Sequence, residues 1–234
     1  MSALFPAAPM GLAGLRFVEA AVRLAVFIDW SNVYRGAREA FGLENKSGRR
    51  GQVDPYRVAK VLVAAGGRRA DGELVRVEVH RGRPLPNHDP LGNAAATLQQ
   101  QRWRQVDPEV VWPRLRPLRF NPTTERLEEK GVDVALAVAA VEWTVLRDVD
   151  RVVIFSHDTD LSPAVETIAR IKGPHAVETA SWRSDRYRKR IPPINGVKNH
   201  FLHEKIFLAL EDLTHYGRAA RRRMAKRDGA RSDA

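Results

Sequence analysis

The sequence contains no cysteine among its 234 residues. This absence excludes disulfide bonds, thiolate metal sites and a cysteine nucleophile. It is consistent with a reducing compartment, and we expect the protein to be cytoplasmic. Long apolar runs are also missing, because no stretch reaches the roughly 20 apolar residues that a membrane-spanning helix needs. We therefore expect no membrane partner.

Acidic residues are fewer than basic ones, with 28 Asp and Glu against 39 Lys and Arg, so the formal net charge is +11. A charge excess of this size bears on binding partners, because it attracts polyanions. Nucleic acid is the first partner to consider. The alternative is a compositional bias toward arginine, which would give the same excess without a polyanionic partner.

The length favours one domain with short appendages. Residues 1–20 are apolar but lack a basic start and a convincing cleavage site, so we interpret them as a disordered leader and not as a signal peptide. We expect residues 21–215 to form the folded domain. Residues 216–234 form a basic tail with little apolar content, and we expect this tail to lack a fixed structure.

Apolar strands alternate with helices along the domain. Leu24–Ile28 and Arg151–Phe155 are short runs of the kind that is buried on both faces of a parallel sheet. Val132–Leu146 is the strongest predicted helix, and its apolar residues cover more than half its circumference, which predicts a deep position. Residues 199–213 also show helical spacing. The alternation predicts an α/β fold, a Rossmann-like parallel sheet flanked by helices on both faces.

Four aspartates lie where a strand ends or a helix begins. Asp29 follows the first strand, Asp158 and Asp160 follow Arg151–Phe155, and Asp133 opens the apolar helix. In folds of this class, sites form at the carboxyl ends of the strands. Two unit charges about 5 Å apart repel by roughly 3 kcal/mol at an effective dielectric of about 20. Converging carboxylates would therefore need a hard cation, Mg²⁺ or Mn²⁺, and the four are candidate metal ligands and catalytic residues.

Each aspartate also has an ordinary structural explanation. Asp29 and Asp133 could cap or stabilise the helices that they precede or begin. The pair formed by Asp158 and Asp160 is the strongest signal, because a spacing of two in extended chain points both side chains the same way. Capping explains one carboxylate and not both.

Three other residues near these aspartates have two interpretations each. Asn32 could contact substrate or orient Asp29, or it could be a simple turn residue. His157 could assist proton transfer, or it could be an incidental surface residue. Trp30 could stack on a base, although a tryptophan in this context more often belongs to the core.

Three motifs, FIDWSN, EEKGVDVALAV and VVIFSHDTDLSPAVE, occur in this order and spacing between about Leu24 and Trp182. Together they resemble the NYN domain family, which belongs to the PIN-like nucleases. The resemblance implies a Rossmann-like (PIN-like) sheet, an acidic cluster that binds magnesium or manganese, and RNA as the usual substrate. By motif match, the family's acidic and polar site positions fall on Asp29, Asn32, Asp133, Asp158 and Asp160.

The sequence departs from the family pattern at two places. Many relatives carry another carboxylate one to two turns after the KGVD aspartate, where this chain has Ala139 and Ala140. Glu142 is about half a turn out of phase with Asp133 and is a poor substitute. Relatives also often have glycine at the position of His157. Both departures concern whether the free enzyme holds a second metal.

Basic residues near the expected site are candidates for substrate binding. Arg81, Arg83 and Lys130 fall in loops beside the acidic rim, and Arg183 opens a segment in which aromatic and basic residues alternate. That mixture suits single-stranded nucleic acid, although the segment could also be a solvated loop. We therefore predict a metal-dependent ribonuclease. The alternative is a non-catalytic RNA-binding protein that keeps the PIN-like fold, and the sequence leaves a homodimer open.

Overall fold

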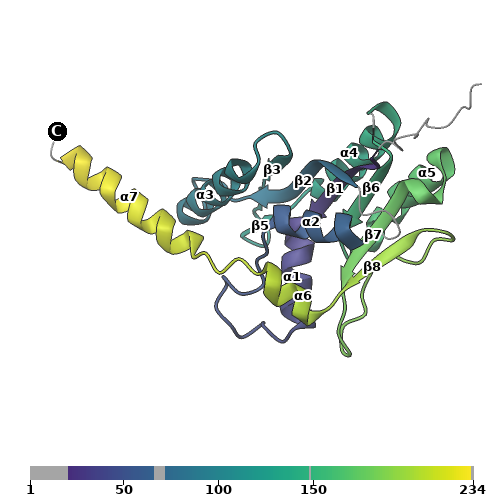
Figure 1. The fold of residues 1–234 in the computed structure, drawn as a ribbon. Helices are drawn as coiled ribbons and strands as arrows, with labels where there is room; N and C mark the ends of the chain where they lie inside the picture. Colours follow the sequence, from purple (N-terminus) through teal and green to yellow (C-terminus); the bar gives the residue numbers. More distant parts are fainter. Residues whose placement is uncertain (1–20, 66–71, 148, 233–234) are drawn as a thin grey trace, which may run out of the picture.

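A computed structural model describes residues 21–65, 72–147 and 149–232 (Figure 1). The leader predicted at residues 1–20 lies outside the described residues. The chain forms a six-stranded sheet in the order β3-β2-β1-β6-β7-β8, and every pairing in it is parallel. Its strands are β1 Arg23–Asp29, β2 Glu73–Arg83, β3 Val111–Pro117, β6 Arg151–Phe155, β7 Val177–Trp182 and β8 Lys198–Leu202.

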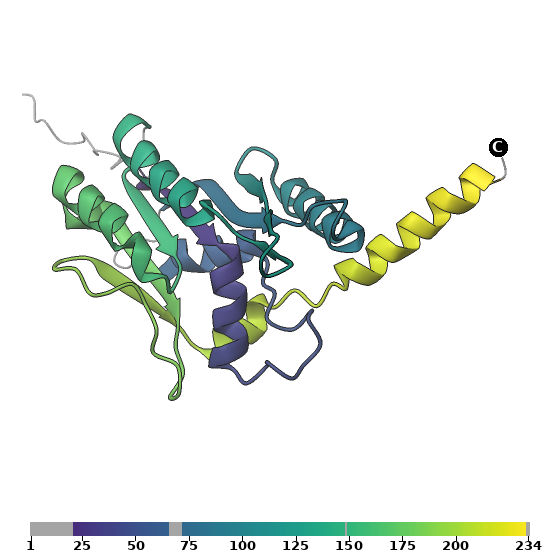
Figure 2. The same ribbon diagram turned by 180° about the vertical axis from the view of Figure 1, so that it is seen from behind.

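Helices cover both faces of this sheet (Figures 1 and 2). The helices are α1 Trp30–Ala40, α2 Pro55–Ala65, α3 Pro90–Val106, α4 Val132–Leu146, α5 Ser162–Lys172, α6 Glu204–Leu210 and α7 Tyr216–Ser232. Side chains of α1, α2, α3 and α6 pack into one core cluster, and side chains of α4 and α5 pack into a second. The predicted α/β class, with helices on both faces, is confirmed.

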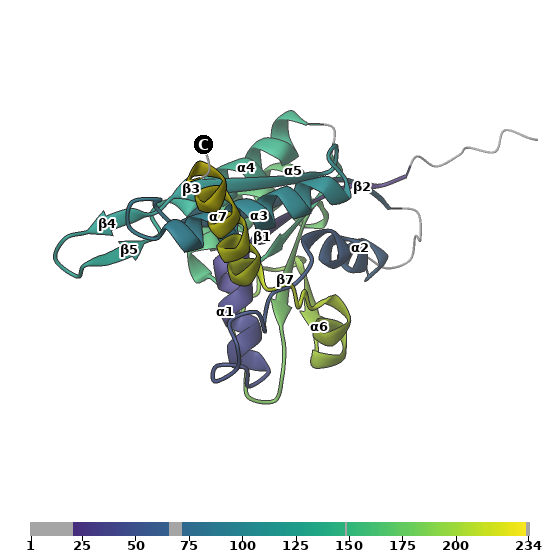
Figure 3. The ribbon, with the colours of Figure 1, turned by 90° about the vertical axis from the view of Figure 1, so that its left-hand side faces the viewer.

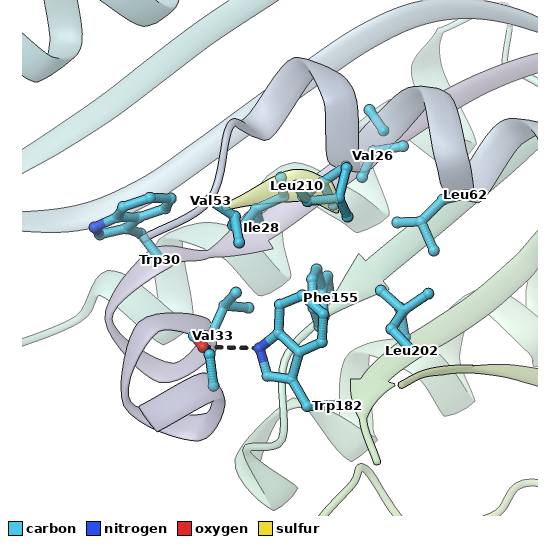
Figure 4. Packing of buried hydrophobic residues seen from close by; sticks show 14 of the residues in the cluster. Val26, Ile28, Trp30, Val33, Val53, Leu62, Phe155, Trp182, Leu202 and Leu210 are labelled. Carbon is cyan, nitrogen blue, oxygen red and sulfur yellow. Dashed lines mark hydrogen bonds between the residues drawn. The ribbon is translucent and has the colours of Figure 1, made fainter. Parts of the chain in front are cut away.

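Strand β1 is buried on both faces, as its apolar sequence predicts. Val26 and Ile28 belong to the cluster under α1 and α2, whereas Phe27 belongs to the cluster under α4 and α5. Figure 4 shows the first cluster, in which the Trp182 indole donates a hydrogen bond of 2.9 Å to the carbonyl of Val33. Each fully buried aliphatic side chain contributes roughly 1.5–3 kcal/mol. This packing fixes the end of β1 relative to its neighbours.

The strand order places a switch point between β1 and β6. From β1 the chain continues to β2 and β3 on one side, and it returns to β6, β7 and β8 on the other. In open α/β sheets, ligands bind in the crevice outside the carboxyl ends of the strands at such a point. Asp29 ends β1, and the segment 156–160 follows β6. Asp29 and the segment 156–160 form two acidic corners, and both therefore lie at the carboxyl edge of the sheet, where this rule places ligand binding.

Two segments differ from the sequence-based expectation. Residues 199–213 were expected to be one helix, but Lys198–Leu202 pair with β7 as strand β8, and only Glu204–Leu210 are helical. The edge of β7 offers hydrogen bonds to this segment, and they outweigh its helical spacing. Residues 121–130 are polar in sequence and would be expected to lead as a loop into the helix at 132, but they contain part of a hairpin in which β4 (Arg119–Asn121) pairs with β5 (Arg126–Glu128).

Helix α4 does not lie as deep as its composition predicts. Leu136 and Ala140 are fully buried against the sheet. On the outer side, Val134 is 60% exposed, Val138 is 62% exposed and Leu146 is 72% exposed. The helix is apolar all round, but the sheet covers only one of its faces.

The basic tail is helical, so the expectation of an unstructured tail is wrong for residues 216–232. Tyr216 and Ala220 are buried, and the start of α7 packs against α3. The rest of α7 projects away from the domain (Figures 1 and 2), and in Figure 3 it lies in front of α3. Among the described helices, none is both long enough and apolar enough to cross a membrane.

Candidate active site

A serine hydroxyl joins the two acidic corners. Asp29 is the N-cap of α1, and its Oδ1 accepts a hydrogen bond of 3.2 Å from the backbone nitrogen of Asn32. Its Oδ2 accepts a bond of 3.0 Å from the hydroxyl of Ser156. The same hydroxyl accepts a bond of 3.1 Å from the backbone nitrogen of Asp158. Ser156 thereby holds the end of β1 against the corner after β6.

The Asp29 carboxyl group is buried among negative charges. Burial raises the pKa of Asp29 to about 6, against the lowering effect of its bonds from Asn32 and Ser156, and the negative charges of Glu129 and Asp158 raise it further. Each carboxylate oxygen accepts one of these bonds and has a second acceptor position. A cation bound there would favour the charged carboxylate and so lower the pKa again.

Glu129 is a site residue that the sequence analysis missed. Its Oε1 accepts bonds of 2.7 Å from the hydroxyl of Ser31 and 2.5 Å from the backbone nitrogen of Gly82. A Cβ added at Gly82 would clash with a methyl carbon of Leu118 and lie 2.6 Å from Cγ of Glu129, so a side chain there would displace both neighbours. The motif EEKGVD contains Glu129, but nothing local in the sequence distinguishes this residue from Glu128.

Asp158 and Asp160 do not lie in extended chain. The segment Thr159–Leu161 is a turn of 3₁₀ helix, η1, and the Oδ1 of Asp158 caps it by accepting a bond of 3.0 Å from the backbone nitrogen of Asp160. Asp158 is half-buried toward Asp29, while Asp160 is exposed. The argument from extended chain was therefore wrong, because the corner turns immediately after Asp158.

Asp133 is half-buried in the first turn of α4. Gly131 is the N-cap residue, with a φ of 70°, and provides no side-chain cap. A carboxylate in this turn is favoured by the helix dipole. Helix α4 packs against η1, but no hydrogen bond or ion pair joins the Asp133 carboxylate to another described residue. Within the described ranges, no group of three or more Asp, Glu or His side chains is arranged to hold a metal ion.

Hydrogen bonds of His157 connect Asn32 on α1, the corner after β6 and the end of β7. The Oδ1 of Asn32 lies 2.8 Å from both the backbone nitrogen and the ring Nδ1 of His157. The Nε2 of His157 accepts a bond of 2.8 Å from the backbone nitrogen of Trp182, so the ring proton is on Nδ1. Burial, with a smaller effect of Lys189, lowers the pKa of His157 to about 3. His157 is thus neither a surface residue nor a proton carrier at neutral pH.

The NYN domain profile matches residues 23–173. The chain belongs to the NYN domain family. This family is part of the PIN-like superfamily, whose members are generally nucleases and typically use divalent metals. A protein of unknown function from Vibrio parahaemolyticus has a similar crystal structure, with a TM-score of 0.50 and 21% sequence identity over 80% of this chain and 94% of that one. A comparison with curated proteins gave no match.

The NYN match ends at residue 173, before β7 and β8. Trp182 at the end of β7 nevertheless holds His157, so the segment beyond the match supports the NYN motif at the SHDTD corner. Arg183 follows directly, with its guanidinium 4.8 Å from the centre of the Phe201 ring. This half-buried residue is a predicted substrate contact on the β7 side of the edge.

The other predicted substrate residues differ in how freely they can bind a phosphate. Arg81 donates to the side chain of Gln99, and burial lowers its pKa to about 10. Arg83 donates a bond of 2.8 Å to the hydroxyl of Thr97. Lys130 is exposed and lies 3.6 Å from Glu128. Of these three residues, Lys130 is therefore the most accessible cation near the acidic residues of the site.

Trp30 belongs to the core, as the commoner interpretation predicted. It is 4% exposed and meets Trp103 edge to face, with ring centres 4.5 Å apart. Its outer edge borders a cleft of about 480 Å³ on the α1 side of the sheet, which is also lined by Tyr34, Arg35 and Arg81. This tryptophan shapes the cleft wall and is too enclosed for a base to stack on its face.

Proposed function

We propose that this NYN protein is a metal-dependent ribonuclease that hydrolyses phosphodiester bonds of single-stranded RNA at the carboxyl edge of β1 and β6. The observation that carries the proposal is the Asp29 carboxyl group, which is buried beside Glu129 and Asp158 with its pKa raised to about 6. Such strongly perturbed groups cluster at functional sites. The net charge of +11 suits a polyanionic substrate.

The side chains at this edge are of the kind that binds Mg²⁺ or Mn²⁺, although in the described part of the free protein they are not arranged as a metal site. All of them offer oxygen atoms, which are the ligands that these hard cations prefer. Asp29, Glu129 and Asp158 would form the core of the set, and Asp133 and Asp160 would complete the set from the first turn of α4 and from η1. When bound, the cation supplies an activated water and offsets negative charge on the phosphoryl oxygens.

The chain's own residues hold the carboxylates in place. Ser156 fixes Asp29, and Ser31 with the Gly82 backbone fixes Glu129. Ligands that are already oriented lose little freedom when they act, which is how positioning contributes to rate. His157 contributes by holding the corner and not by moving a proton, because it stays neutral.

The experiment is cleavage of labelled single-stranded RNA by the purified full chain with Mn²⁺. We expect Asp158→Asn to reduce the rate by at least about two orders of magnitude, which is the usual loss when one electrostatic stabiliser of a transition state is removed. Glu166→Gln is the matched control, since Glu166 is an exposed carboxylate on α5. An unchanged rate in Asp158→Asn would refute the assignment.

A non-catalytic RNA-binding role is the second candidate, and Ala139 favours it. Many relatives have a carboxylate near this position, whereas here Ala139 lines a cleft beside α4 and offers no ligand. The two functions separate when RNA is incubated with and without EDTA. Retention of intact RNA that is indifferent to EDTA and Mn²⁺ supports the binding role, and cleavage that requires the metal supports the nuclease.

A further inference from the structure

A second and larger cleft, of about 880 Å³, lies between α4 and the β2–β3 side of the sheet. Its walls include Arg76, Arg114, Arg116, Arg147, Val134 and Val138. We call it the α4 cleft. Side chains alternate along β2, so the residues between the buried Val77 and Val79 face the α4 side. None of the residues named in the sequence analysis as substrate contacts lies in it except Arg83.

The α4 cleft begins at the acidic edge. His80 lines the cleft and is the register partner of Asp29 on the neighbouring strand. Partners on paired parallel strands point to the same face, and the rings of Phe27 and His80 confirm this with centres 6.4 Å apart. Gly131, which directly precedes α4 and follows the Glu129 loop, also lines the cleft. A chain bound at Asp29 could therefore continue directly into it.

The charge of the cleft is strongly positive, because five arginines line it against two glutamates, Glu78 and Glu142. Glu78 is buried and already paired, with Arg76 at 2.7 Å and Arg114 at 3.1 Å. This pairing holds two arginines in the wall, and Arg83, Arg116 and Arg147 supply the remaining positive charge. The cleft therefore favours an anionic ligand.

Two exposed arginines mark the ends of the cleft. A guanidinium nitrogen of Arg116 lies 3.9 Å from the position of a Cβ on Gly131, at the start of α4. Arg147 follows the last residue of α4 and pairs with Glu142 only at 3.4 Å, with both side chains about half exposed. Such surface pairs contribute little. The 15 residues of α4 span about 22 Å between these cations.

Apart from Glu142, the α4 wall between the two cations is apolar. Val134 and Val138 are among the most exposed apolar side chains, and Ala135 and Ala139 lie beside them. Opposite, the Arg76 guanidinium lies 4.2 Å from the Trp112 ring centre and 4.8 Å from that of Trp143. Apolar surface between spaced cations suits a ligand with alternating phosphates and apolar rings, and not a small inorganic anion.

We propose that the α4 cleft binds the single-stranded RNA on one side of the scissile phosphate and leads it from the acidic edge to Arg147. This inference rests on the proposed function, because it uses RNA as the ligand. At a rise of roughly 3.4 Å per nucleotide of a stacked strand, the length of α4 accommodates about six nucleotides. The phosphates contact Arg116 and Arg147, and the bases lie on Val134 and Val138.

The first test uses the absence of cysteine, since an introduced thiol is unique in this chain. Val138→Cys is prepared in an Asp158→Asn background, so that RNA can bind without being cut. We expect saturating ten-nucleotide RNA to slow alkylation of this thiol at least about fivefold, as a stacked strand excludes reagent from the wall. Ile171→Cys in the same background is the control, because Ile171 is 49% exposed on α5 outside the cleft.

Fluorescence anisotropy in the same samples separates the two proposals. If RNA is bound but the thiol at position 138 reacts at its free rate, the cleft assignment is wrong while the proposed function stands. If the wild-type chain neither binds nor cleaves RNA, the proposed function fails, and the cleft assignment fails with it. Protection at position 138 without protection at position 171 supports the cleft.

The second test measures how RNA affinity depends on salt. Each phosphate contact on a single strand contributes about 0.7 to the slope of log affinity against log salt. The double variant Arg116→Ala with Arg147→Ala should therefore lower the slope by about 1.4. The double variant Arg170→Ala with Lys172→Ala removes the same charge from the far end of α5 and should leave the slope unchanged. Equal slopes in the two double variants would overturn the inference.

Discussion

The side-chain oxygen of Asn32 accepts hydrogen bonds from two groups of His157, the backbone nitrogen and the ring Nδ1, each at 2.8 Å. The two residues are 125 positions apart in the sequence. One is in the first turn of α1 and the other follows β6, so the contact ties together the two corners that carry Asp29 and Asp158. The FID-x-x-N pattern therefore includes a structural asparagine.

Removing this acceptor should destabilise the fold and disturb the site. Asn32→Ala leaves two buried donors of His157 without a partner, and an unsatisfied buried group costs about 1–3 kcal/mol. We expect the free energy of unfolding to fall by about 2 kcal/mol or more, measured by urea denaturation. Asn195→Ala, at an exposed position, is the control and should change little. Equal stability of the two variants would show that the hydrogen bonds between Asn32 and His157 do not stabilise the fold.

Gly36 and His157 should show a measurable coupling. A Cβ at Gly36 would lie 2.6 Å from Cε1 of the His157 ring, so Gly36→Ala overpacks a closed space and should cost about 1–3 kcal/mol. In a His157→Gly background the ring is gone, and the same substitution should cost much less. A double-mutant cycle gives the coupling energy. Gly217→Ala is the control, because a Cβ there meets nothing within 4 Å.

The buried Asp29 predicts a stability that depends on pH. Its pKa is raised from 3.8 to about 6, so the folded state binds the proton more tightly than the unfolded state. Stability from this group is present below pH 4 and is lost as the pH rises to about 6 and above. Asp29→Asn removes the buried charge, so in EDTA it should stabilise the protein at pH 8 relative to wild type, by up to about 3 kcal/mol.

The measurement is urea denaturation of wild type and Asp29→Asn at pH 4.5 and pH 8. The advantage of the variant should grow with pH and shrink when Mn²⁺ is added, because only the wild type gains from the ion. Glu166→Gln should show neither trend. If the stability advantage of Asp29→Asn is constant with pH, burial does not raise the pKa of Asp29 in the wild type.

The motifs at strand ends could be placed from the sequence because apolar runs mark buried strands directly. Leu24–Ile28 and Arg151–Phe155 predict β1 and β6, and the position of Asp29 follows from the first. The local geometry of the corner after β6 could not be predicted from the sequence in the same way. Whether Asp158 and Asp160 point together depends on η1, a turn held by a bond from the Asp160 backbone to the Asp158 carboxylate.

The other differences between the predictions from the sequence and the structure arise from tertiary contacts. His157 looks polar and local in the sequence, but its partners Asn32 and Trp182 come from distant elements. The exposed face of α4 could not be read from a helix that is apolar all round, because only the sheet determines which side is covered. Glu129 was missed for a related reason. Its binding partners, Ser31 and Gly82, lie 98 and 47 residues away.

Glu129 provides the sharpest test of the site as it is assembled in space. Glu129→Gln keeps the side-chain oxygen for Ser31 and Gly82 but removes one negative charge beside Asp29. Groups that surround metal ligands typically contribute 10–100-fold to metal affinity or activity, and we expect a ligand to contribute at least as much. We expect about this loss in Mn²⁺-dependent cleavage, together with a lowered pKa of Asp29 in the free protein. Glu125→Gln is the control, because Glu125 is an exposed carboxylate in the nearby turn between β4 and β5. If both variants cleave RNA at the wild-type rate, Glu129 belongs to the scaffold of the edge and not to its chemistry.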